Sequence, residues 1–209
     1  QQRELVRRFA TPQVAQDLDV SGFALGGHRV RATAMFSDIR GFTSLSEQQS
    51  PEDTIELLNT YYTLMLDAIS SRGGVVNQMV GDGLMAVFGA PVALADPCGA
   101  AVRAAIDMIE MIELFNREPD RVGKPALAIG IGIASGDVIA GYTGTQQRAT
   151  YTCVGTAVNL AARLEAHTKT VHRPILIDGD TRAAVATGFN IEPLGPTRLN
   201  GMSHLVEVF

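Results

Sequence analysis

Two aspartates stand where a folded chain can hold a carboxylate beside free backbone N–H groups. Asp82 lies between two glycines in VVNQMVGDGLMAVF, where two apolar β-type runs flank a turn and predict a β-hairpin. Asp38 follows the apolar run ATAMF, where a strand stops and a helix can begin near Thr43. A lone turn aspartate more often bonds its own backbone than a metal. A pair of carboxylates instead suits two Mg²⁺ ions held about 4 Å apart for phosphoryl chemistry.

A second pair of polar residues lies on a predicted helix near the end of the chain. Asn159 and Arg163 are four residues apart in AVNLAARLE and therefore share one helix face. A planar guanidinium binds phosphate oxygens in a fixed fork geometry. Taken alone, the pair is more typical of a solvated helix face than of a site. Its interpretation depends on the two aspartates.

Composition limits the classes of function. The 209 residues, 19% of them charged, fit one α/β domain with a short appendage. A net charge of −5 argues against nucleic-acid binding, which needs a basic surface. The two cysteines and four histidines lack the spacing of zinc ligands or of a disulfide framework. This cysteine usage makes a reducing cytoplasm the default location of the domain. No apolar run is long enough to cross a membrane, and a membrane-anchored parent protein stays open.

The chain order predicts a mixed-sheet α+β layout with helices on one face. Residues 1–27 are expected to form a helical connector from an upstream regulatory region, since the chain begins at Gln1 rather than Met. The remaining expected elements are a Gly-rich turn at 22–28, strands at 30–36, 127–134 and 151–154, helices opening at 51, 97 and 157, a turn at 135–137, a loop at 141–147 and a closing hairpin at 195–209.

Four segments in order, FSDIRGFTSLSE, VGDGLMAVFGAP, GIGIASGDVIAG and YTCVGTAVNLAARLE, resemble the catalytic domain of class III nucleotide cyclases, the adenylyl and guanylyl cyclase family. The resemblance covers residues 28–209. It implies a ferredoxin-like fold, with a mixed and antiparallel sheet and helices packed on it. It also implies a head-to-tail homodimer that converts a nucleoside triphosphate, with ATP favoured, to its 3′,5′-cyclic monophosphate and pyrophosphate.

The resemblance also implies roles for particular residues. Asp38, the Ile39 backbone and Asp82 would hold two Mg²⁺ or Mn²⁺ ions, while Asn159 would hold the ribose and Arg163 would neutralise charge in the transition state. In the family, one ion lowers the pKa of the ribose 3′-hydroxyl and the other grips the triphosphate. The residues expected to bind substrate through backbone or side chain are Ile39, Gly41, Phe42, Thr43, Gln78, Arg148 and Thr156.

Two positions that read the purine in this family depart from its common pattern. Gln78 replaces a frequent Lys, and Thr156 replaces a frequent Asp, although Thr is known in adenylyl variants. A threonine hydroxyl can accept from the adenine amino group, whereas a glutamine amide serves adenine or guanine. Asn200 also stands where many relatives have Lys. GTP or dual specificity therefore stays open.

Two hypotheses of other kinds also stay open. One is a non-catalytic, dimerising or nucleotide-sensing module. The other is an unrelated two-metal phosphotransferase such as a diguanylate cyclase, although the sequence has no GGDEF-like turn.

Overall fold

The structure is a computed structural model and describes residues 12–21, 25–145, 149–185 and 187–209. Its helices are α2 (Pro12–Ser21), α3 (Phe42–Glu47), α4 (Pro51–Ser71), α5 (Pro97–Asn116), the 3₁₀ turn η1 (Pro119–Arg121), α6 (Thr156–Val171) and α7 (Gly179–Ala184). Its strands are β1 (Gly26–Ile39), β2 (Val75–Val80), β3 (Gly83–Phe88), β4 (Ile129–Gly144), β5 (Ala149–Val154), β6 (Ile175–Ile177), β7 (Gly195–Thr197) and β8 (Val206–Val208). None of the helices in these ranges is both long and apolar enough to span a membrane.

The centre of the molecule is a six-stranded sheet built on two long strands. Its order is β2-β3-β1-β4-β5, and β6 joins β4 as the one parallel pair among the described strands. β1 and β4 run antiparallel over their whole length, from Gly26 opposite Tyr142 to Ile39 opposite Ile129. The expected α+β class with a mixed, largely antiparallel sheet is confirmed. A separate two-stranded hairpin, β7 and β8, closes the chain.

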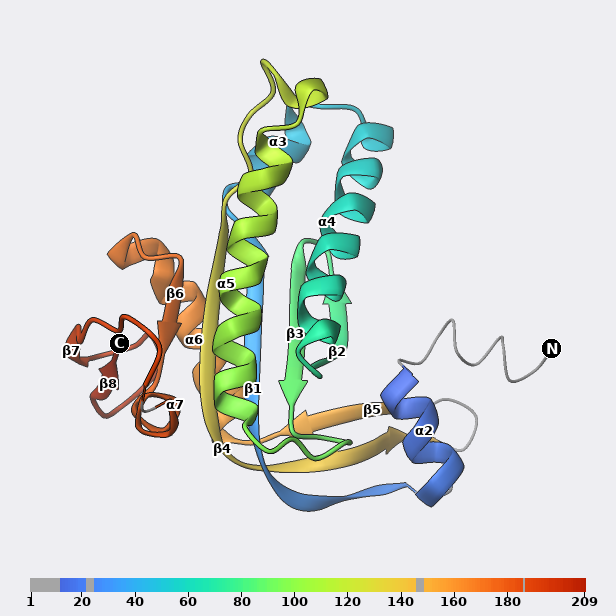
Figure 1. The fold of residues 1–209 in the computed structure, drawn as a ribbon, viewed down its shortest axis with the longest axis vertical. Coiled ribbons are helices and arrows are strands. Elements are labelled where there is room, and N and C mark those ends of the chain that lie inside the picture. The colour runs from blue at the N-terminus through green and yellow to red at the C-terminus, as the bar shows by residue number, and fades with distance from the viewer. Residues whose placement is uncertain (1–11, 22–24, 146–148, 186) are drawn as a thin grey trace.

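Helices cover both faces of this sheet. In Figure 1, α4 and α5 run side by side over one face, while α6 lies behind β4. The alternation of side chains along a strand explains the division: Ile131 and Ile133 of β4 belong to the core under α4 and α5, whereas Ala134 packs with Ala161 and Leu164 of α6. The expectation of helices on one face is therefore wrong, because β4 is apolar or small on both faces.

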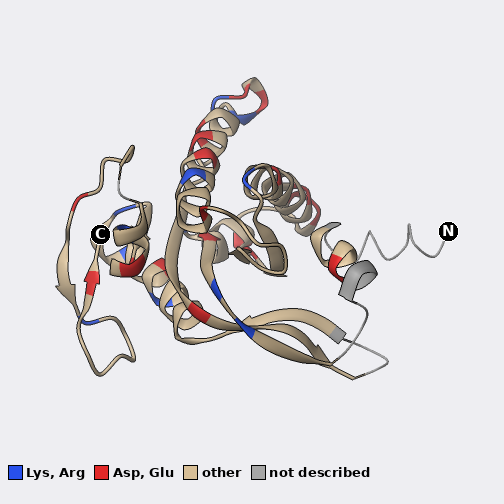
Figure 2. Cartoon of the chain, turned by 60° about the horizontal axis from the view of Figure 1, so that its bottom comes forward, with Lys and Arg blue, Asp and Glu red and all other residues tan. Residues whose placement is uncertain are grey.

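Charged residues are kept away from these two cores. Figure 2 shows the charged positions of both signs mainly on the helices and connections, with long uncharged stretches along the strands. This distribution follows from the cost of burying an unpaired charge. The charged residues that do lie on the strands of the central sheet differ in exposure: Arg29, Arg31 and Asp137 are more than half exposed, whereas Asp38, at the end of β1, is 21% exposed. Asp38 lies beside Lys169 of α6, and this place is the candidate site.

Three of the expected boundaries are wrong. β1 begins at Gly26 rather than at residue 30, because Gly26 and Gly27, which were expected in a turn, pair with β4. Residues 135–137 form no turn, since Ser135 and Asp137 stay paired with β1 and the strand continues to Gly144. The expected loop at 141–147 is strand as far as Gly144, paired with β5. In each case long-range pairing overrides the local turn preference of Gly and Ser.

Helix α2, which lies in the segment predicted to be a connector, contacts the sheet. The Tyr142 hydroxyl donates to the Asp17 carboxylate at 2.9 Å, which links α2 to the far end of β4. Residues 1–11 and 22–24 lie outside the described residues. The closing hairpin expected at the end of the chain is present as β7 and β8.

Candidate active site

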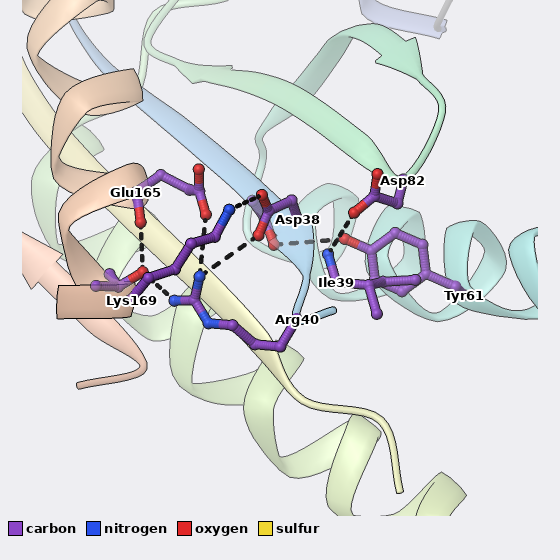
Figure 3. A network of polar contacts seen from close by, with 9 residues as sticks. Asp38, Ile39, Arg40, Tyr61, Asp82, Glu165 and Lys169 are labelled. Atoms are coloured by element: carbon purple, nitrogen blue, oxygen red, sulfur yellow. Dashed lines mark hydrogen bonds and ion pairs between the residues drawn. The ribbon is translucent and has the colours of Figure 1, made fainter. Parts of the chain in front are cut away.

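The Asp82 carboxylate lies directly beside the end of β1. The Ile39 backbone N–H donates to Asp82 Oδ2 at 3.0 Å, and the two residues are 43 positions apart in sequence. The β2–β3 turn delivers Asp82 to this point because Ser37 pairs with Leu84 across the β1–β3 ladder. Asp38, next to Ile39, therefore belongs to the same small region as Asp82 (Figure 3).

A network of charged groups from α6 and from the residue after β1 surrounds Asp38. Lys169 Nζ lies 2.9 Å from Asp38 Oδ2, and an Arg40 nitrogen lies 3.6 Å from Oδ1. Arg40 in turn contacts Glu165 at 3.5 Å and donates to the Thr168 hydroxyl. Figure 3 shows Lys169 and Arg40 converging on Asp38 while Asp82 approaches Ile39 from the other side.

Burial and the grouping of negative charge shift several protonation equilibria here. Burial raises the pKa of Asp82, although hydrogen bonds from its own backbone and from Ile39 lower it. Burial also raises the pKa of Glu165 to about 8, and the hydrogen bond and charge of Asp38 act in the same direction. The hydrogen bond to Asp38 raises the pKa of Lys169. Burial thus disfavours the ionised form of both Asp82 and Glu165, and a nearby cation would favour it.

The donor groups at this point fit a hard divalent cation. Among the described residues, Asp38 Oδ1 is buried and has no partner in hydrogen-bond geometry, although the Arg40 guanidinium lies 3.6 Å away as an ion-pair partner. The Asp38 carboxylate therefore keeps capacity as a ligand. Two carboxylates and nearby backbone oxygens are the ligands that Mg²⁺ and Mn²⁺ prefer. In the described part of the chain no group of three or more His, Cys, Asp or Glu gathers into a metal site. A cation held by Asp38 and Asp82 would therefore take its other ligands from water or from a phosphate-bearing molecule.

The segment after Asp38 turns sharply into a short helix. Gly41 has φ 64°, a left-handed conformation that favours glycine, and α3 begins at Phe42. The first turn of a helix leaves N–H groups without an intrahelical acceptor, so Phe42 and Thr43 can offer donors to an anion. The Arg40 N–H is not among these donors, because it donates to Ala128 at 2.7 Å.

Asn159 and Arg163 line a different region of the same chain. They lie with Thr156 on a cavity of about 760 Å³ between α6, the β1–β4 pair and the loop before β8. Thr156 and Asn159 are exposed, and Arg163 is partly buried. The turn before β8 lies beside Arg163, since a methyl group on Gly201 would be 3.6 Å from its guanidinium. Asn200, which stands where many relatives have Lys, lies in this turn.

The two halves of the expected site lie on nearly opposite faces of α6. At 3.6 residues per turn, Arg163 and Glu165 are separated by about 200° around the helix axis. The Glu165 face looks toward Asp38, so the Arg163 face looks away from it. One chain therefore brings Asp38 and Asp82 together and Asn159 and Arg163 together, but keeps the two pairs apart.

Of the two base-reading candidates, Gln78 lies with the aspartates and Thr156 with the arginine. Gln78 is an exposed residue of β2, next to a bulge that shifts the β2–β3 register. Arg148, expected to reach the pyrophosphate, lies outside the described residues.

The side chains of Arg40, Glu165 and Lys169 were not among the residues predicted for this site. Lys169 contacts Asp38 across 131 residues of sequence, through the packing of α6 against β4. The spacing of Glu165 and Lys169, four apart on one helix face, was the one local signal, and it is equally typical of a solvated ion pair.

A sequence model of the family described as the adenylate and guanylate cyclase catalytic domain matches residues 28–209. This chain belongs to that family. Adenylate cyclase 1 of Rhizobium meliloti (strain 1021) is 33% identical over 181 residues, which are 87% of this chain and 27% of that enzyme. The adenylate cyclase of Anabaena cylindrica is 38% identical over 151 residues, 70% of this chain and 29% of that protein. The cyclase domain thus spans less than a third of either relative.

Solved structures show the same fold. The adenylyl cyclase CyaB from P. aeruginosa is 32% identical with a TM-score of 0.80, and the match covers 88% of this chain and 94% of that one. The guanylyl cyclase Cya2 is 33% identical with a TM-score of 0.77, and the match covers 88% and 92%. The expected cyclase fold is confirmed. Since an adenylyl and a guanylyl cyclase are both similar to this domain, the comparisons do not choose between ATP and GTP.

Proposed function

We propose that this cyclase domain converts ATP to 3′,5′-cyclic AMP and pyrophosphate in a site completed by two chains of a homodimer. The observation that carries the proposal is the arrangement around α6. Asp38 and Asp82 meet at one face of this helix, while Asn159 and Arg163 project from the other. A second copy can bring its Asn159 and Arg163 to the aspartates, and two-fold symmetry then makes two equivalent sites.

The chemistry requires groups that meet charge where it develops. The ribose 3′-oxygen attacks the α-phosphorus in line, one P–O bond forms, and pyrophosphate leaves. Divalent cations held by Asp38, Asp82 and the Ile39 carbonyl would lower the pKa of the 3′-hydroxyl and neutralise phosphate charge. The Arg163 guanidinium neutralises charge on the reacting phosphate, and Asn159 orients the ribose.

Exposed apolar side chains beside both half-sites support association. Met79 and Val80, next to the Asp82 turn, are 51% and 77% exposed. Near the Asn159 face, Val154 and Leu205 are each 56% exposed. Such residues at the core of a protein–protein contact are more stable when covered. A head-to-tail dimer covers both groups in one symmetric interface.

Adenine is the favoured base because Thr156 presents a hydroxyl that can accept from the 6-amino group. Gln78 leaves GTP as a second candidate, since its amide can turn to serve guanine N1–H. A guanylyl cyclase also stands among the similar structures. We therefore propose ATP as the preferred substrate and not as the exclusive one.

The test is to incubate the purified domain with Mn²⁺ and equal concentrations of ATP and GTP, and to identify products by mass and by comparison with 3′,5′ and 2′,3′ standards. Excess 3′,5′-cyclic AMP is expected, and the Asp82→Asn protein is the matched control. Cyclic GMP as the main product would reverse the base assignment. No cyclic nucleotide from a folded, dimeric protein would favour a non-catalytic module instead.

A further inference from the structure

Lysine is scarce in this chain, and one of its two lysines contacts the Asp38 carboxylate. Lys169 lies near the end of α6, with Nζ 2.9 Å from Asp38 Oδ2. The other lysine, Lys124, is exposed in the connection before β4. A charge-assisted hydrogen bond of this length fixes the ammonium group on the carboxylate.

The two cations that face Asp38 are held differently. Arg40 is anchored by Glu165 and Thr168, and its side chain is 22% exposed. It also crosses Gly130 of β4, where a methyl group would overlap the guanidinium. Lys169, by contrast, is 53% exposed and extends on a flexible stem. Lys169 can therefore leave Asp38 for water, whereas Arg40 is held in place.

We propose that Lys169 is a built-in competitor of the divalent cation: its ammonium group is paired with the Asp38 carboxylate and is displaced when the cation binds that carboxylate. The inference rests on the proposed function, because it takes Asp38 as a cation ligand. Lys169 thereby sets the cation concentration at which the site fills. When no cation is bound, it also keeps Asp38 neutralised among the other carboxylates.

The physical reason is that two cations on one carboxylate repel each other and share its single negative charge. A Mg²⁺ ion binds oxygen at about 2.0–2.1 Å, and an ammonium on either oxygen of the same carboxylate stays close enough to be repelled by it. Because Lys169 is half exposed, solvent screens both its attraction to Asp38 and its repulsion of the ion. Removal of Lys169 is therefore expected to tighten cation binding by a modest factor, about three- to tenfold.

The first arm of the test measures affinity rather than activity. Mn²⁺ binding without nucleotide is followed by the electron paramagnetic resonance signal of free Mn²⁺, for the wild type, Lys169→Met, Lys124→Met and Asp38→Asn. Tighter binding to Lys169→Met alone is expected, with Lys124→Met equal to wild type and Asp38→Asn defective. Equal or weaker binding to Lys169→Met would overturn the proposal.

The second arm uses the wild-type protein and so does not depend on the folding of a Lys169 variant. The two lysines are acetylated for short times with and without Mn²⁺, and the modified peptides are quantified by mass spectrometry. Mn²⁺ should raise the rate at Lys169, leave Lys124 unchanged and have no effect in Asp38→Asn. An unchanged or slower rate at Lys169 would overturn the proposal.

The outcomes separate this inference from the function on which it rests. If Asp38→Asn fails to bind Mn²⁺ while the wild type and Lys169→Met bind Mn²⁺ equally well, only the proposed role of Lys169 is contradicted. If Asp38→Asn keeps wild-type affinity, the cation site at Asp38 falls, and the proposed mechanism and the role of Lys169 fall with it.

Discussion

Asp82 is placed by its backbone contacts, and its charge is what the site uses. The Ile39 N–H donates to its carboxylate. Burial raises the pKa of Asp82, which means that burying the ionised carboxylate costs folding free energy. An amide of the same shape can still accept from Ile39 but supplies no negative charge. Structural and functional roles of this residue can therefore be separated.

Asp82→Asn is expected to lower the rate of cyclisation by at least ~10²-fold, as the loss of one electrostatic element of an active site usually does. The unfolding temperature should change little. Initial rates at saturating Mn²⁺ and thermal unfolding by circular dichroism check the two statements. Asp67→Asn, an exposed carboxylate on α4, is the control and should match wild type. Near-normal activity of Asp82→Asn would remove this residue from the cation site.

Gln78→Lys is expected to shift the ratio of kcat/KM toward ATP, because a cationic donor can serve adenine N1 but opposes the N1–H of guanine. Discrimination by a buried polar group can be large, since the wrong base leaves a donor unpaired. The measurement is the ATP/GTP ratio of kcat/KM in the two proteins. An unchanged ratio would mean that position 78 does not face the base.

For single residues, the sequence predicts the two site carboxylates but not the side chains that contact them. Asp38 and Asp82 can be found because a strand end and a hairpin tip each mark a carboxylate in a special place. Lys169 cannot be found in this way, because its contact depends on how α6 crosses β4. Side chains that act through tertiary packing leave no local pattern.

Among the elements, the contact between α6 and β4 positions the site. Gly132 lets the helix approach the strand, since a methyl group there would overlap the backbone of Ala161 and Glu165. Gly130, two residues earlier on the same face, leaves the space that Arg40 crosses. The GIGIA run therefore combines isoleucines that fill the core with glycines that leave room for Arg40 and α6. Its glycines set the distance between Asp38 and the charged face of α6.

Gly132→Ala is expected to destabilise the domain by about 1–3 kcal/mol or more, because backbone atoms cannot move aside as a flexible side chain can. Gly136→Ala, on the same strand, is the matched control: its methyl group would lie 3.4 Å from the Ala157 side chain and should be tolerated. Urea unfolding of both variants measures the difference. Equal stability of the two proteins would contradict this account of α6 packing.

Element types are predictable here where the pattern is long, and boundaries fail where pairing decides. The helices α4 and α5 follow from apolar spacing, with Ser50 and Asp96 capping their first turns. The segment at 135–137 has turn composition, yet β1 holds it as strand. Both faces of β4 are apolar or small, so the sequence of this strand does not show which face α6 covers. The face opposite α4 and α5 could therefore not be predicted for α6.

For the whole molecule, an active site shared between two chains requires a dimer. Val80→Glu places a charge beside the Asp82 turn, in the proposed interface, and is expected to weaken self-association by about tenfold or more. Val122→Glu is the control, because Val122 is as exposed but lies in the connection before β4. Sedimentation velocity over a concentration series gives both dissociation constants. Unaltered association of Val80→Glu would exclude this face from the interface.

The central claim is that each site takes its aspartates from one chain and its Asn159 and Arg163 from the other. Asp82→Asn and Arg163→Ala proteins, each inactive alone, are mixed, and subunit exchange is verified by native mass spectrometry. A mixed dimer then has one intact site and one doubly altered site. With random pairing, activity should return to roughly a quarter of wild type. Mixtures that exchange subunits and stay inactive would contradict the shared site and the head-to-tail dimer.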